Sequence, residues 1–586
     1  MIGLVKPQGI KVKWREWNEE TFREAEKKGK LVLLNLSASW CLWCRIMDET
    51  SYSDPDIVES INTRFVPVRV DIDRRPDIAE RYNFGGSPTT AFLTPEGEVV
   101  TGGTYIPPEK LKTMIRQVID FYEKNKDKIN EKVLALGRIR AEAETASAVL
   151  LEPSESIVQD IINMLVDDFD STYGGFGSQP KLPMCDAVEL ALAQYQLTKD
   201  DVLLYIATKT LDEMRTRNIH DKVEGGFFRY SVTEDWSTLH YEKMLNGNAQ
   251  LLRNYLHAYQ VTGRMEYAET ATGIIRYVDS TLSRENGGFY GSQASDEQYY
   301  KLSGEERAEA SPPPVDKTVY TNWNSLMVSA YLDAYATLGL EDCRNHAVKT
   351  LDFLAEKLYR KGIGLYHYFD GKPRVTGLLS DHLFFTRALI DAYQTLGGGA
   401  YLELALEVAD LMVDSFVDMK NGGVFDILPG ADAVGLLKNR RKTITQNGLA
   451  ADAFNTLHNL TGNDVYHAVA EVTLSFFTKT YQSYGLHAAA YAMALDRFLN
   501  PPVRIVTVGS KSDEKTRKLH TKALSIFEPR RVAELLDTEE DVEKIQMYGL
   551  PKATEPAVYA LIENIRSPPV KEPDEVIPKL TSFIQR

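Results

Sequence analysis

The 586-residue sequence predicts a multidomain fold: an N-terminal α/β domain, a large all-α region of paired helices, and a small C-terminal α/β appendage. Three observations lead to this prediction. A strand-forming run enters a Cys-x-x-Cys pair and a helix, a glycine-rich loop recurs six times between helical segments, and strands alternate with helices again after Asn500. The predicted limits are 1–123 for the α/β domain, 124–152 for a helical linker, 153–499 for the helical region and 500–586 for the appendage.

The composition is that of a globular protein, with 43% hydrophobic and 26% charged residues. The N-terminus has no apolar core of a signal peptide, and no run approaches the ~20 apolar residues of a membrane helix. We therefore expect a cytoplasmic protein with no membrane partner. The formal net charge of −16, without a block of Lys and Arg, also excludes nucleic acid as an expected partner, since phosphate contacts need a basic surface.

The four cysteines, Cys41, Cys44, Cys185 and Cys343, are too few for a disulfide framework in so long a chain, which agrees with a reducing compartment. Cys185 and Cys343 occur singly in helical stretches, where we expect small buried apolar side chains. No second Cys-x-x-Cys or Cys-x-x-His accompanies the first pair. We therefore expect neither a metal site nor a cofactor.

The order of elements in the first domain predicts its α/β character. Residues 31–38 form an apolar strand, the stretch after Cys44 forms a helix, and residues 65–71 form a second strand. A turn is followed by a hairpin over 89–103, and an amphipathic helix begins at residue 109. This order predicts an α/β domain of about one hundred residues.

The thiol pair lies at a strand-to-helix junction, which places Cys41 at the helix N-terminus. Unpaired N–H groups and the helix dipole favour the thiolate there. Cys44, one turn further on, can attack a mixed disulfide and release the product. The pair predicts thiol–disulfide exchange with a protein client, with a retained but inactive pair as the alternative.

Six glycine-rich loops predict the architecture of the helical region. They are Gly174-Gly175, Gly225-Gly226, Gly287-Gly288, Gly362-Ile363-Gly364, Gly422-Gly423 and Tyr484-Gly485-Leu486. Helices are expected before them at 154–169, 200–218, 265–283, 341–360, 400–418 and 463–482, and after them at 184–197, 242–261, 322–338, 380–396, 445–460 and 486–498. Twelve helices in two alternating sets of six are the pattern of an (α/α)6 toroid, with one set inside the ring and the other outside.

In such a ring the six loops and the N-termini of the inner helices open at one mouth, where polar and aromatic side chains gather. Aromatic faces stack on sugars, and amides and acids hydrogen-bond to hydroxyls. The mouth therefore predicts a sugar or sugar derivative as the ligand, although Trp323 could equally belong to the core. The expected substrate-binding residues are Arg229, Tyr230, Asp235, Trp236, Trp323 and Asn324.

Two pairs are candidate catalytic residues. His240 and Glu242 are expected to open an inner helix as an acid/base pair, unless Glu242 only complements the helix N-terminus. Asp381 and His382 open another inner helix after Ser380, although ordinary helix-start chemistry would also explain Asp381. Two histidines from different inner helices would suit epimerisation, whereas Glu242 and Asp381 would suit glycoside hydrolysis at a separation of ~5–10 Å.

Residues 15–125 resemble the thioredoxin superfamily in the strand, in Trp40-Cys41-Leu42-Trp43-Cys44 and in Ser87-Pro88. The resemblance implies that Pro88 is cis, faces the thiol pair and contributes to substrate binding. Two departures weigh against redox activity. Asn35 stands where the superfamily has a buried acid, and Leu42 stands where better-known relatives have Gly or a polar residue.

From about residue 10 to its end, the chain also resembles thioredoxin-domain-containing proteins related to spermatogenesis-associated protein 20. The matching phrases include Trp43-Cys44-Arg45-Ile46-Met47, His240-Tyr241-Glu242-Lys243-Met244-Leu245 and Trp323-Asn324-Ser325-Leu326-Met327. The resemblance implies a thioredoxin-like domain joined to a six-hairpin glycosidase-like toroid. The family usually has His at the position of Leu42 and Trp at that of Ser87.

Residues 291–320 are polar, contain three consecutive prolines, and predict a loop near the mouth that could act as a lid. Three functions stay open from the sequence. The chain is a carbohydrate-active isomerase or hydrolase, a thiol–disulfide oxidoreductase that uses Cys41 and Cys44 on a protein client, or a non-catalytic interaction protein.

Overall fold

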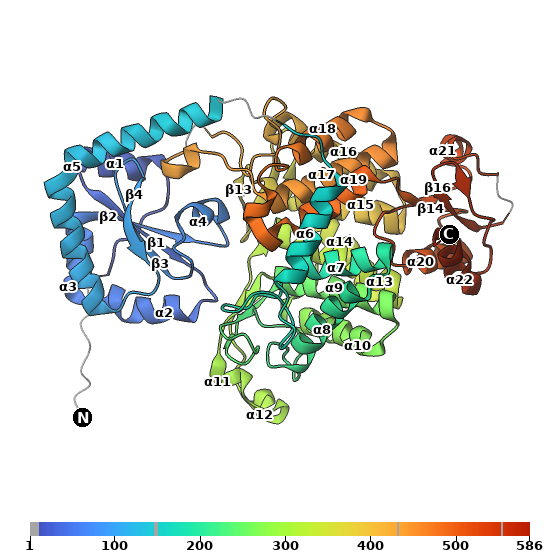
Figure 1. The fold of residues 1–586 in the computed structure, drawn as a ribbon. Helices are drawn as coiled ribbons and strands as arrows, with labels where there is room; N and C mark the ends of the chain where they lie inside the picture. Colours follow the sequence, from blue (N-terminus) through green and yellow to red (C-terminus); the bar gives the residue numbers. More distant parts are fainter. Residues whose placement is uncertain (1–10, 146–149, 431–432, 552–554, 586) are drawn as a thin grey trace. The chain divides into compact units, whose positions relative to one another are not determined.

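The structure is a computed structural model that describes residues 11–145, 150–430, 433–551 and 555–585. It divides the chain into two compact units (Figure 1). The first contains residues 1–147 together with 294–296 and 427–441, and the second contains 148–293, 297–426 and 442–586.

The first unit is built on a four-stranded sheet with the order β2-β1-β3-β4. Its strands are β1 (Leu31–Ser37), β2 (Phe65–Asp71), β3 (Thr89–Leu93) and β4 (Val99–Gly103), and its helices are α1 (Glu19–Lys28), α2 (Leu42–Glu49), α3 (Pro55–Arg64), α4 (Pro76–Tyr82) and α5 (Pro108–Thr145), with a 3-10 turn η1 (Ser51–Ser53). β1 is parallel to β2 and antiparallel to β3. Leu33 and Phe92 of the sheet share one core with Met47, Ile61 and Leu111 of α2, α3 and α5.

Two short segments from later in the sequence complete the first unit. In the segment 427–441, which contains the 3-10 turn η3 (Gly435–Lys438), Leu436 O accepts from Arg81 Nε at 3.1 Å and Leu436 N donates to the hydroxyl of Tyr82 at 2.7 Å. In the segment 294–296, Ser295 N donates to Trp40 O at 3.2 Å. Sequence position alone places both segments in the helical region, so these contacts can be found only from the tertiary structure.

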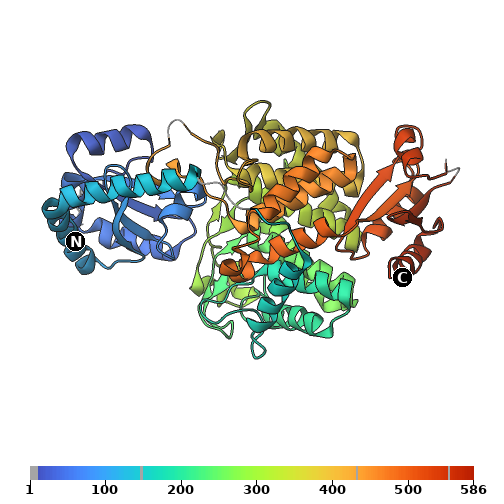
Figure 2. The ribbon, with the colours of Figure 1, turned by 45° about the horizontal axis from the view of Figure 1, so that its top comes forward.

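Twelve helices form the body of the second unit (Figures 1 and 2). The outer set is α6 (Glu155–Asp167), α8 (Asp201–Thr216), α10 (Met265–Tyr277), α14 (Glu341–Lys357), α16 (Gly399–Phe416) and α18 (Asp464–Ser475). The inner set is α7 (Cys185–Thr198), α9 (Leu245–Thr262), α13 (Thr321–Leu338), α15 (Leu379–Leu396), α17 (Ile444–Thr461) and α19 (Ala489–Leu499). Each inner helix packs against the next in this order, and α19 packs against α7, which closes the ring. The predicted (α/α)6 toroid is therefore confirmed.

Short elements connect the helices of the ring. They are β5 (Tyr230–Ser231), β6 (Leu239–His240), β7 (Lys243–Met244), η2 (Val278–Leu282), β8 (Ser292–Gln293), α11 (Glu297–Tyr300), α12 (Gly304–Glu309), β9 (Val315–Asp316), β10 (Val319–Tyr320), β11 (Tyr359–Arg360), β12 (Gly364–Phe369), β13 (Pro373–Thr376) and η4 (Tyr481–Ala488). The helix expected at 242–261 begins only at Leu245. His240 and Glu242 therefore lie on and beside short strands and do not open the helix, which corrects the expected placement.

The C-terminal appendage is a sheet of order β15-β14-β16-β17 that belongs to the second unit. Its elements are β14 (Val503–Val508), α20 (Glu514–Leu524), β15 (Arg531–Leu536), α21 (Val542–Met547), β16 (Ala557–Ile562), β17 (Ile565–Arg566) and α22 (Pro573–Ile584). It is anchored at the last turn of α15, where the Gln394 side chain accepts from Ala533 N at 2.8 Å and Gln394 O contacts His520 Nε2 at 2.7 Å. The appendage thus covers the C-terminal end of an inner helix.

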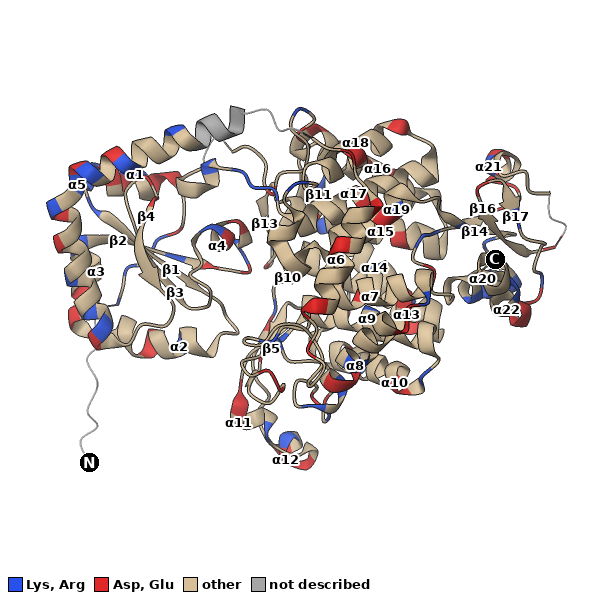
Figure 3. Cartoon of the chain, in the orientation of Figure 1, with Lys and Arg blue, Asp and Glu red and all other residues tan. Residues whose placement is uncertain are grey.

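Charged residues of both signs are distributed over the helices, as the alternation of blue and red along α5 shows (Figure 3). Within the described residues, no helix combines the length and the apolar composition needed to cross a membrane.

Candidate functional site

The thiol pair lies where α2 begins. Cys41 is the N-cap of α2, its sulfur accepts from Cys44 N at 3.1 Å, and the two cysteines are joined in a disulfide. The Ser87–Pro88 peptide bond is cis, and Ser87 O lies 3.6 Å from Cys41 Sγ. The predicted residues Cys41, Cys44 and Pro88 are thus held in one loop cluster of the first unit.

An apolar rim surrounds this cluster. Trp43 is 45% exposed and packs against Tyr105 with ring centroids 5.0 Å apart, and Phe84 is 40% exposed. Beneath the pair, buried Asn35 accepts from Arg69 Nε at 2.8 Å, and Arg69 also forms an ion pair with Asp48. An amide bound to an arginine cannot carry a proton, so Asn35 offers no acid/base group to the thiols.

At the ring, the structure brings four predicted residues together in a cluster that we call the mouth cluster. β5 pairs with β6, so that the rings of Tyr230 and His240 stack at 4.3 Å. Glu242 Oε1 lies 3.2 Å from Arg229 Nη1 and 3.6 Å from His240 Nδ1. Burial alone would raise the pKa of Glu242, but His240 and Arg229 more than offset it and lower this pKa. Glu242 is therefore a carboxylate that binds two basic groups.

Asp235 and Trp236 do not join the mouth cluster. Asp235 accepts from the backbone and the hydroxyl of Ser237 at 3.2 and 2.7 Å, which stabilises a turn. Trp236 is fully buried and donates from Nε1 to Tyr173 O at 3.0 Å. A Cβ added to Gly175 would come within 2.8 Å of the Trp236 ring, so this indole fills space under a glycine loop. Trp323 is half-buried and packs on Tyr320 at 4.6 Å.

Asn324 belongs to a repeated structural device. It is the fourth residue of α13, where its Oδ1 accepts from Phe289 N at 2.6 Å and its Nδ2 donates to Phe289 O and Tyr320 O. Asn248 of α9 and Asn447 of α17 make the same contacts with Phe227 and Val424. In each case the partner follows a Gly-Gly pair. The amide therefore joins a glycine loop to the next inner helix, and its hydrogen-bonding groups face the backbone.

His382 takes the same fourth position in α15. Its Nε2 accepts from Leu365 N at 3.0 Å and its Nδ1 contacts Leu378 O at 2.8 Å, while burial lowers its pKa. Both ring nitrogens are thus bound to backbone groups, which leaves neither for proton transfer to a ligand. Asp381 is equally buried, with both oxygens 3.0 Å from His367 Nδ1. The polar atoms of Asp381 and His382 thus contact protein groups, and the catalytic role of this pair stays a prediction.

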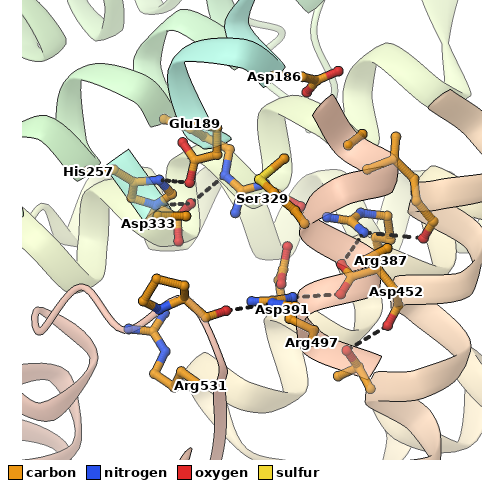
Figure 4. Close-up of a pocket in the computed structure, with 18 of the residues that line it drawn as sticks. Asp186, Glu189, His257, Ser329, Asp333, Arg387, Asp391, Asp452, Arg497 and Arg531 are labelled. Carbon is orange, nitrogen blue, oxygen red and sulfur yellow. Dashed lines mark hydrogen bonds and ion pairs between the residues drawn. The ribbon is translucent and has the colours of Figure 1, made fainter. Parts of the chain in front are cut away.

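A different set of side chains lines a cavity along the axis of the ring (Figure 4). This axial cavity has a volume of about 210 Å³ and is lined by residues of all six inner helices. The lining is completed by five residues before and at the start of β15: Leu524, Phe527, Glu528, Pro529 and Arg531. Its wall is rich in Asp, Glu, Arg and His. Sequence analysis proposed none of these residues as functional.

His257 of α9 organises one side of the axial cavity. Its Nδ1 lies 2.7 Å from Glu189 Oε1 and its Nε2 lies 3.6 Å from Asp333 Oδ2, which also accepts from Arg253 Nε at 2.7 Å. Burial disfavours the charged imidazole, but Glu189 and Asp333 raise the pKa of His257 to about 9. His257 is therefore an imidazolium at neutral pH.

Asp452 of α17 organises the opposite side. Its two oxygens lie 2.7 Å from Arg387 Nη1 and 2.8 Å from Arg497 Nη1. Burial would raise the pKa of Asp452, but Arg497 and Arg387 lower it to about 2. One carboxylate thus bridges two arginines, and the wall is held by ion pairs between different helices.

Five further Asp, Glu and Arg side chains of the axial cavity stand outside these networks. Two of them contact Arg530: Asp496 forms an ion pair with it, and Glu528 accepts from Arg530 N at 3.0 Å. Among the described residues, neither Asp186 nor Asp391 has a hydrogen-bond or ion-pair partner. Within the part of the chain that the structure describes, Arg531 donates only to the main-chain oxygens of Leu524 and Ile526, at 2.7 and 3.0 Å. Burial raises the pKa of Asp186, so this carboxyl group tends to keep its proton. Figure 4 shows Asp391 between the two networks.

The spacing of charges contains a signal for this cavity. Arg253 and His257 are four residues apart on α9, as are Arg387 and Asp391 on α15, on helices that are otherwise largely apolar and buried. Residues four apart share one helix face, and a charged pair on such a face needs a polar environment inside the protein. Among the described residues, no group of three His, Cys, Asp or Glu side chains is arranged to hold a metal ion.

Comparisons with known proteins found a relative along most of the chain and a family model for its N-terminal part. Residues 4–139 match the profile of a thioredoxin-type family of unknown function, DUF255. Mouse spermatogenesis-associated protein 20 is 25% identical over 656 aligned residues, covering 90% of this chain and 83% of the relative, which confirms the resemblance predicted from the sequence. A buckwheat (Fagopyrum esculentum) H-type thioredoxin is 36% identical over 89 residues, which are 15% of this chain and 69% of that protein. The structure of cellobiose 2-epimerase from Spirochaeta thermophila superimposes with a TM-score of 0.48 at 17% identity, covering 59% of this chain and 97% of the epimerase.

Proposed function

We propose that the helical ring binds a small carbohydrate-like ligand and transforms it by acid–base chemistry, as an isomerase or a hydrolase. The observation that carries this proposal is the axial cavity, in which ionisable side chains from six helices line one space of about 210 Å³. We place the chemistry there and not at the mouth, because the mouth residues Asn324, Asp381 and His382 are bound to protein groups.

The size and polarity of the axial cavity support a ligand of this class. Sites for drug-sized ligands have volumes of ~300–1,000 Å³, so this cavity suits a smaller molecule. Its wall offers carboxylate acceptors and guanidinium donors, which an apolar ligand would leave without partners at a large desolvation cost. A polyhydroxylated ligand presents both donors and acceptors around a small ring and can satisfy both.

Two carboxyl groups of the wall can supply the acid and the base. Asp186, whose pKa burial raises, can hold a proton for donation, and Asp391 has no partner that occupies its oxygens. Isomerisation needs one group to remove a proton and one to return it, and hydrolysis needs an acid at the leaving oxygen and a base at water. We propose Asp186 as the acid and Asp391 as the base. The mouth cluster of Arg229, Tyr230, His240 and Glu242 then binds hydroxyl groups of the entering ligand.

A thermal-unfolding screen of the full chain against aldoses, ketoses and disaccharides tests this proposal. A ligand at 100 times its Kd should stabilise the protein by ~2.7 kcal/mol. Asp391→Asn and Asp186→Asn should lose most of that stabilisation, while Asp464→Asn should keep it because the Asp464 side chain is 97% exposed. An equal shift in wild type and Asp391→Asn, or no shift with any sugar, would contradict the proposal.

A second activity, thiol–disulfide exchange with a protein client, is favoured by the disulfide of Cys41 and Cys44 at the N-terminus of α2. In the reduced protein, the Cys41 thiolate would attack a client disulfide and release one client thiol, and Cys44 would then displace the second. Cys44→Ser should trap the mixed disulfide and Cys41→Ser should not. The absence of a trapped client in both variants would contradict this activity.

We also propose that the protein is cytoplasmic and that its domains have the limits expected from the sequence, 1–123, 124–152, 153–499 and 500–586.

A further inference from the structure

We propose that the ligand of the axial cavity is a sugar acid, whose single carboxylate is bound by Arg531. This inference rests on the proposed function, because it names the class of carbohydrate that the cavity accepts. It places the anchoring group on the C-terminal appendage, since Arg531 is the first residue of β15.

The ion-pair networks in the wall of the axial cavity contain more cations than carboxylates. Arg253, His257, Arg387 and Arg497 have direct carboxylate partners, but these four cations share only three carboxylates: Glu189, Asp333 and Asp452. These two ion-pair networks therefore carry one positive charge in excess. Of the other carboxyl groups in the wall, Asp496 is paired with Arg530, which lies outside the wall, and burial raises the pKa of Glu528. Arg531 and Asp391 carry opposite charges and do not change the excess.

Arg531 is the cation of this set that lacks a carboxylate within ion-pair distance among the described residues. Its Nη1 binds two main-chain oxygens, and no hydrogen-bond partner within the described part of the chain occupies Nε or Nη2. Burial lowers the pKa of Arg531, Arg497 lowers it further, and the more distant carboxylates of Asp333, Asp391 and Glu528 do not offset these effects. A buried guanidinium in this state gains most from a carboxylate, which matches its planar fork with two hydrogen bonds.

The alternative, a ligand cation at the unpartnered aspartates, is disfavoured by their surroundings. Asp391 is close enough to Arg253, Arg497 and Arg531 to attract all three guanidinium groups. A ligand ammonium group beside Asp391 would be repelled by these arginines. Asp186 is also a poor partner for a cation, because burial raises its pKa and favours its neutral form.

A carboxylate fits better than a phosphate for two reasons. The excess of one positive charge in the two ion-pair networks balances one negative charge, whereas a phosphate monoester carries about −1.5 to −2 at neutral pH. The cavity of about 210 Å³ also leaves little room for a tetrahedral group beside a sugar ring.

Titration calorimetry on the full chain tests the inference with four probes of similar size: a hexose, the corresponding hexuronate, the 2-amino-2-deoxyhexose and the hexose 6-phosphate. We expect the hexuronate to bind at least tenfold more tightly than the hexose. In Arg531→Gln this ratio should fall to about one while the affinity for the hexose changes less than twofold. Arg517→Gln, an exposed arginine of the same appendage, is the matched control and should retain the ratio.

Each other result has a defined meaning. Equal affinity for hexose and hexuronate in the wild type would overturn this inference and leave the proposed function intact. Tightest binding of the amino sugar or of the phosphate would overturn the carboxylate assignment. Binding of none of the four would count against both proposals. If Arg531→Gln does not fold, Arg531→Lys keeps the charge without the planar fork, and an unchanged ratio there would also argue against bidentate carboxylate binding.

Discussion

In the first turn of α9, α13 and α17 an asparagine is held by backbone hydrogen bonds, whereas one to three turns further on these same helices carry ionisable side chains that contact one another. Asn324 illustrates the first case, since its three hydrogen bonds all go to main-chain groups. Asp333, nine residues later on α13, contacts Arg253 and His257 of α9 and lines the axial cavity.

The difference teaches that polarity at the mouth of a helical ring is a weak guide to chemistry. Asparagine amides bound to the backbone connect the loops with the inner helices and retain little capacity for a ligand. Charged groups around the axial cavity, by contrast, are not fully satisfied by local backbone, and their partners come from neighbouring helices. The comparison predicts that substituting either the first-turn asparagines or the charged cavity residues lowers stability. Ligand binding should change mainly when the cavity residues are substituted.

The largest effect is expected from Asp452→Ala, which leaves Arg387 and Arg497 buried without their shared carboxylate. Removing one partner of a buried ion pair destabilises a protein by about 3–5 kcal/mol. Urea denaturation should show a loss of that size together with loss of ligand stabilisation. Asp464→Ala, at an exposed site, should change stability by less than about 0.5 kcal/mol. An unchanged free energy of unfolding in Asp452→Ala would contradict the distinction between the first-turn asparagines and the charged residues of the cavity.

Asn324→Ala should destabilise the protein by about 3 kcal/mol, at about 1 kcal/mol for each of its three hydrogen bonds. The same denaturation assay measures this loss, with Asn345→Ala at an exposed position as the control. Ligand affinity, corrected for stability, should change less than twofold. A large selective loss of affinity would return Asn324 to the set of substrate-binding residues.

The imidazolium of His257 predicts a pH window for stability. Its pKa is raised from 6.5 to about 9 in the folded chain, so its stabilising contribution is complete below pH 6.5 and is lost as the pH rises through 9. The stability difference between wild type and His257→Gln should therefore shrink by about 2–3 kcal/mol between pH 6 and pH 9.5. Parallel pH curves for the two proteins would show that His257 is not held as a cation.

The smallest effect is expected when the thiol pair is substituted and ligand binding by the ring is measured. The described residues that line the axial cavity all belong to the second unit, whereas Cys41 and Cys44 belong to the first. The double variant Cys41→Ser/Cys44→Ser should therefore change the affinity for a cavity ligand by less than twofold in calorimetry. A larger change would show that the redox state of the first unit controls the second.

Much of the fold could be predicted because its signals are local. The strand over Phe65–Asp71 and the hairpin of β3 and β4 follow from apolar runs and turn residues, and the twelve helices follow from periodicity between glycine loops. The same rules misplaced the start of α9 by three residues, because Lys243 and Met244 pair with β8 instead of continuing the helix. That pairing is a tertiary contact, which local propensity does not contain.

By itself, the sequence determined the thiol pair at a helix start, the repeated loops and the number of helices in the ring. Each of these features depends on residues a few positions apart. Only the tertiary structure decided which polar groups are satisfied and which face the cavity. Arg253 and Asp333 are 80 residues apart and become partners only when the ring closes. Arg531 reaches the cavity only because the appendage packs on the end of α15. Long-range packing assigns these partners, and neither periodicity nor spacing along the chain contains that information.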